Sequence, residues 1–130
     1  MGRRGYVQTR QAEHNGSDFS YSAAESASSF LFEHGIDVVM HPGGMGNDGD
    51  NDQWEIEIPI RHKKVKGRDR YWKDFAKISK IAHELRANPG LVIGDDGKGE
   101  YGDQLAGILE DGIKAAKKYD YGWIIVDWWN

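Results

Sequence analysis

Cysteine is absent from this chain of 130 residues, and no long hydrophobic run occurs in it. Without a thiol the chain can form no disulfide, no zinc–thiolate or iron–sulfur site, and no cysteine nucleophile. A membrane-spanning helix needs roughly 20 consecutive apolar residues, and no segment approaches that length. We therefore expect a cytoplasmic protein with no membrane partner.

The motifs that mark many enzyme active sites are missing as well. The chain has no GxSxG or GxxxxGK[ST] spacing, and its five histidines show no HxxxH spacing. The glycine-rich segment 94–102 carries three carboxylates that would repel a phosphate, so we predict a turn there. The sequence names no catalytic residue and no cofactor. It leaves enzymatic activity undecided and favours a protein that is not an enzyme.

What the chain does contain fits one folded unit rich in glycine and aromatic residues. A domain usually holds roughly 100–150 residues, so we predict a single domain over residues 1–130. There are 17 glycines, and the aromatic residues include five tryptophans. Aromatic side chains can fill a core or form a binding surface, and composition does not separate the two.

The clearest predicted strand covers residues 54–60, where apolar and acidic residues alternate. Trp54, Ile56, Ile58 and Ile60 point one way and the two intervening glutamates point the other, which predicts one buried and one solvated face. Pro59 cannot donate a ladder hydrogen bond, so this strand lies at an edge or stops there.

Hydrophobic periodicity elsewhere predicts three helices and three more strands. The helices are expected over about 23–34, 70–87 and 102–118, with Asp69 as the N-cap of the second. The strands are expected over 6–11, 36–40 and 123–129. We predict an α+β fold of two layers, with an antiparallel or mixed sheet of about four strands and helices mainly on one face. The order β-α-β-β-α-α-β is that of a ferredoxin-like fold with an extra helix.

Charge is distributed unevenly along the chain. The net charge is −4, yet residues 61–86 carry ten basic and three acidic side chains, so the rest of the chain is strongly acidic. Residues 61–73 concentrate seven of these cations beside aromatic residues, in a segment predicted to connect a strand to a helix. Cations there could bind phosphates and aromatics could stack on bases; they could equally bind an anionic protein surface or only pair with acidic neighbours. The candidate contact residues are Arg61, Lys63, Lys64, Lys66, Arg68, Arg70, Trp72 and Lys73.

The long loop 41–53 is the other unusual segment. Asp48, Asp50 and Asp52 alternate as the first ligands of a calcium loop do, but Gln53 and Pro59 stand where an EF-hand needs glycine and glutamate. These aspartates and His41 are kept as weak metal candidates. The pattern favours a solvated loop over a metal site, and a loop that orders against a partner is the second alternative.

Three function hypotheses follow from these observations. The first is a small non-enzymatic module that binds a protein partner, such as a phage or mobile-element inhibitor of a host machine of the anti-CRISPR or other anti-defence type. The second is a single-stranded nucleic-acid-binding protein that uses residues 61–73. The third is a metal-dependent hydrolase centred on the 41–52 loop. Both a monomer and a homodimer are compatible with the sequence.

Overall fold

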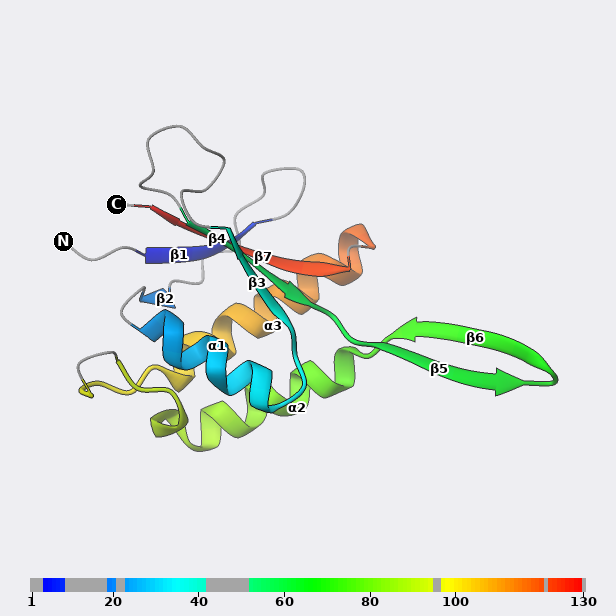
Figure 1. Ribbon diagram of the computed structural model, residues 1–130, viewed down its shortest axis with the longest axis horizontal. Coiled ribbons are helices and arrows are strands. Elements are labelled where there is room, and N and C mark those ends of the chain that lie inside the picture. The colour runs from blue at the N-terminus through cyan, green and yellow to red at the C-terminus, as the bar shows by residue number, and fades with distance from the viewer. Residues whose placement is uncertain are drawn as a thin grey trace.

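A computed structural model describes residues 4–8, 19–20, 23–41, 52–94, 97–120 and 122–129. These residues form an α+β fold in which three helices cover one side of an antiparallel sheet and a separate hairpin extends from one end (Figure 1). None of the described helices is long and apolar enough to cross a membrane. The elements are β1 (Arg4–Gln8), β2 (Phe19–Ser20), α1 (Ala24–Glu33), β3 (Val38–His41), β4 (Asp52–Glu57), β5 (Ile60–Val65), β6 (Arg68–Lys73), α2 (Phe75–Ala87), the 3-10 turn η2 (Pro89–Leu91), α3 (Gly102–Tyr119) and β7 (Trp123–Trp129).

Among the described residues the main sheet has five strands in the order β2-β1-β7-β4-β3, and each neighbouring pair is antiparallel. The C-terminal strand β7 therefore lies at the centre, between β1 and β4. A second sheet contains only β5 and β6. The α+β class and the antiparallel sheet agree with the prediction, whereas the strand count is higher and the ferredoxin-like arrangement is not confirmed.

The core lies between the main sheet and the helices. Trp54, Ile56 and Ile58 are buried, as their alternation predicted, and strand β4 ends at Glu57, shortly before Pro59. The same alternation placed Ile60 on the buried face, and that part was wrong: Ile60 begins β5 of the projecting hairpin and is 56% exposed. The helices supply the opposing apolar surface, with Leu31 of α1 and Leu85 of α2 completely buried. This two-layer packing buries the apolar residues whose periodic spacing in the sequence predicted the helices and strands.

Helix α3 approaches the central strand closely at Gly112. A Cβ atom built at Gly112 would clash with Cγ2 of Ile124 in β7. Glycine costs roughly 1 kcal/mol relative to alanine inside a helix, and here that cost permits close helix–sheet contact. The predicted helix 102–118 is thus confirmed within one residue of its end.

Helix α2 starts later than predicted. The sequence pattern placed its start near Arg70 with Asp69 as N-cap, but α2 begins at Phe75 and Asp74 is its N-cap. The Asp74 carboxylate accepts a hydrogen bond from the backbone N–H of Lys77 at 3.1 Å. The predicted first turn of the helix is instead strand β6, so that part of the helix prediction was wrong.

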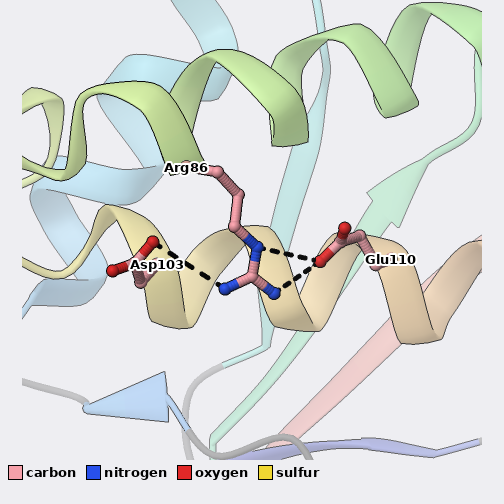
Figure 2. Close-up of polar contacts among 3 residues, drawn as sticks. All are labelled: Arg86, Asp103 and Glu110. Carbon is pink, nitrogen blue, oxygen red and sulfur yellow. Dashed lines mark hydrogen bonds and ion pairs between the residues drawn. The ribbon is translucent and has the colours of Figure 1, made fainter.

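An ion-pair cluster joins α2 to α3 on the surface (Figure 2). The Arg86 guanidinium donates to Glu110 from Nη2 at 2.6 Å and from Nε at 3.2 Å, and its Nη1 lies 3.8 Å from Asp103. The hydrogen bond to Glu110 raises the pKa of Arg86 above its already high ordinary value. Exposed pairs of this kind contribute only about 0.2–1 kcal/mol, so the buried core carries most of the stability.

Candidate functional site

The basic segment 61–73 is a β-hairpin rather than a connector. Strands β5 and β6 pair in antiparallel register from Ile60 opposite Lys73 to Val65 opposite Arg68. The turn consists of Lys66 and Gly67, with φ of 52° and 77°. Two successive positive φ values define the type I′ turn that suits the twist of a two-residue hairpin. The prediction of a strand-to-helix connector was therefore wrong.

Every residue from 60 to 72 is exposed, because this hairpin extends beyond the body of the protein (Figure 1). Six residues per strand correspond to a length of about 20 Å. Tyr71 is 68% exposed and Trp72 is 44% exposed, so both aromatics are surface residues. Neither aromatic is part of the core. A helix beginning near Arg70 would instead have placed Tyr71 in the core.

Strand alternation divides the hairpin into two chemically different faces. Residues directly opposite each other in an antiparallel pair lie on the same face, and successive residues of a strand alternate between faces. The hairpin has a single acidic residue, Asp69, which lies on the face opposite most of the cations. We call the other face the cationic face; it consists of Arg61, Lys63, Val65, Arg68, Arg70 and Trp72.

Within the part of the chain that the structure describes, the cations in the middle of the cationic face have no acidic partner. Among the described residues, no carboxylate forms an ion pair with Lys63, Arg68 or Arg70. Their positive charges therefore lie side by side in solvent and create a local field that attracts anions. Lys66 adds a further charge at the turn.

The opposite face is organised around a histidine. His62 Nε2 lies 2.7 Å from Oδ1 of Asp69, and its ring packs against Tyr71 with centroids 4.7 Å apart and planes tilted by 30°. Lys64 stands directly across from Asp69 in the register. Charges on this face are thus partly neutralised within the hairpin.

The root of the hairpin is tied to the body by polar contacts. The Asp74 N–H donates to the Pro59 carbonyl at 2.7 Å, and Arg61 Nε lies 3.4 Å from Oδ2 of Asp74. Lys73 donates a hydrogen bond to Asp120, and this bond lowers the pKa of the Asp120 carboxyl below its ordinary value. Lys73 is thus engaged at the root, unlike the cations nearer the turn.

The metal candidates fall mainly outside the described residues. Asp48 and Asp50 are not described, and only the backbone of His41 and Asp52 is, at the ends of β3 and β4. Within the described part of the chain, no group of three or more potential ligands could hold a metal ion. The metal site stays a prediction from the sequence.

A second exposed surface lies at the edge strand β3. Phe32 of α1 is 72% exposed, and Val39 and Met40 of β3 are exposed as well. A groove of about 340 Å³ separates α1 from β3, with Phe32 and Val38 among its lining residues. Strand β3 ends the sheet order, so its outer side is not paired with another described strand.

The glycine-rich segment before α3 serves packing and turn geometry. Gly97 and Gly99 have positive φ values, and a Cβ at Gly102 would lie 2.6 Å from Cα of Pro89. These constraints account for Gly97, Gly99 and Gly102, and the two positive φ values agree with the predicted turn.

Sequence reasoning missed two contributions to the hairpin region. It did not include Asp120, which lies 47 positions beyond its partner Lys73, and no local pattern connects the two. It also assigned no role to Lys77 and Lys80, although both line a groove beside the hairpin root. Their spacing of three residues, which places them on one helix face, was the available signal.

Comparison with known protein families, curated proteins and solved structures finds no match to this chain.

Proposed function

We propose that this protein binds nucleic acid through the cationic face of the β5–β6 hairpin. One observation carries the proposal: the register collects Lys63, Arg68 and Arg70 on an exposed face without a carboxylate. Clustered cations bind phosphates and release counterions, which is the main source of affinity for nucleic acid. Arginine forks add bidentate geometry suited to phosphate oxygens.

The shape of the hairpin supports the same proposal. A two-stranded ribbon has little stability by itself, and no layer formed by the described residues covers either face of this one. A ribbon about 20 Å long can follow a nucleic-acid backbone while the acidic body stays at a distance. The body limits the contact area, since its negative charge repels phosphates beyond the hairpin.

Salt-dependent binding tests this proposal. We would titrate labelled DNA with the wild type, Arg68→Ala/Arg70→Ala and the control Lys114→Ala/Lys118→Ala, whose lysines lie on α3. Each lost phosphate contact makes the negative slope of log affinity against log salt shallower by about 0.7–0.9. The slope of the hairpin variant should therefore be shallower than that of the wild type by about 1.4–1.8. Equal slopes for all three proteins would refute the hairpin as the binding site.

A protein-binding module remains the second candidate function, and the β3 edge favours it. The exposed Phe32 and the adjoining groove would suit an apolar side chain of a partner that adds a strand to β3. A partner captured from nuclease-treated lysate by the wild type, and lost with Phe32→Ala, would support this function. Capture that nuclease abolishes would favour nucleic acid.

A further inference from the structure

A groove of about 700 Å³ lies where the hairpin meets α2. It is distinct from the β3 edge and shares only Arg61 with the cationic face. Strand β5 contributes Ile60, Arg61 and His62 to its lining, and the first turns of α2 contribute Lys77 and Lys80. Its volume falls within the roughly 300–1,000 Å³ of sites that hold small ligands. The groove therefore has room for a ligand of nucleotide size.

The charges in the groove favour an anion. The lining contains three cations, Arg61, Lys77 and Lys80, and one carboxylate, that of Asp74, whose side chain is only 13% exposed. Both Asp74 oxygens are already engaged, one by the Lys77 backbone N–H and the other by Arg61. Among the described residues no carboxylate pairs with the ammonium groups of Lys77 or Lys80. The groove thus keeps an excess of positive charge.

The same groove has an apolar and aromatic side. Pro59, Ile60 and Ala76 line it, and the His62 ring beside them packs against Tyr71. The contact between His62 and Asp69 holds that ring in place. A flat, partly apolar group can pack against this wall while an attached anion reaches the cations. A nucleotide combines these two properties.

We propose that the groove holds one unpaired nucleotide, with its base against His62 and Ile60 and its phosphate near Lys77 and Lys80. This inference rests on the proposed function, because the cationic face would hold the adjoining backbone. Arg61 belongs to both surfaces and connects them. A base inside a duplex is stacked and paired and cannot enter the groove without leaving the helix. The protein should therefore prefer single-stranded nucleic acid.

The test compares one labelled oligonucleotide alone with the same oligonucleotide annealed to its complement. Wild-type protein should bind the single strand about tenfold more tightly, which is the scale of one stacked base. Lys77→Ala/Lys80→Ala and, separately, His62→Ala should reduce single-strand affinity about tenfold and leave duplex affinity nearly unchanged. Lys114→Ala/Lys118→Ala is the charge-matched control for the lysine pair, and melting curves verify that each variant folds.

The outcomes separate this inference from the proposed function. Equal affinity for both oligonucleotides, or a preference that survives the groove substitutions, would overturn the groove while leaving the cationic face as the binding site. Absence of binding by the wild type to either oligonucleotide would overturn both. If the groove variants lose the preference for the single strand and the control variant keeps it, the result would support binding of an unpaired nucleotide in the groove.

Discussion

Lys73, the last residue of β6, donates a hydrogen bond to Asp120, which ends α3 in a left-handed conformation. The contact joins the hairpin root to the junction between α3 and the central strand β7. Lys73 is 22% exposed and Asp120 is 94% exposed, so the pair lies at the boundary between protein and solvent. It gives the projecting hairpin a fixed base from which the cationic face extends.

This ion pair should make the hairpin root sensitive to acid. Lys73 holds the pKa of Asp120 below the ordinary value of 3.8, mainly through the hydrogen bond. A carboxyl whose pKa is lower in the folded state than in the unfolded state stabilises the fold at any pH above the unfolded-state pKa. This stabilisation is lost as the pH falls through the folded-state pKa. We expect the Asp120 carboxyl to titrate below 3.8 by NMR, and Lys73→Met to move it back toward 3.8. The same titration in both proteins would show that the contact does not form in solution.

Substitution of Gly67 should destabilise the hairpin and leave the core folded. Its φ of 77° is strained for a β-branched residue, at a cost of roughly 1–2 kcal/mol. Gly67→Val should therefore expose the β5–β6 amides to hydrogen exchange and weaken nucleic-acid binding, with little change in melting temperature. Lys66→Asn should increase the protection of the same amides from exchange, because Asn-Gly is the preferred type I′ pair. A large fall in melting temperature for Gly67→Val would mean that the hairpin unfolds together with the core.

Gly112 should be a packing requirement of α3. Gly112→Ala places a methyl group against Ile124 and should destabilise the protein by about 1–3 kcal/mol, measured by chemical denaturation. In an Ile124→Ala background the conflict is removed. The same substitution should then be neutral or stabilising by up to about 1 kcal/mol, because alanine favours the helix. Equal effects in both backgrounds would contradict close contact between these two residues.

Local pattern alone determined the elements that have one face in the core. Strand β4 was predicted from the alternation of Trp54, Ile56 and Ile58, and α3 from its apolar stripe, since burial of one face imposes a period on the sequence. The concentration of cations over 61–73 was also evident without coordinates. Its role as a candidate binding segment could therefore be stated from the sequence.

Only the tertiary structure decided what that segment is. Both faces of the hairpin are in solvent, so burial imposes no alternation on its sequence, and the period-3 and period-4 spacing of Tyr71, Phe75 and Ile78 imitated a longer helix. The segregation of Lys63, Arg68 and Arg70 from Asp69 depends on register, which the Lys66–Gly67 turn fixes. The Lys73–Asp120 contact and the groove between β5 and α2 join residues distant in sequence, and packing of the whole chain brings them together.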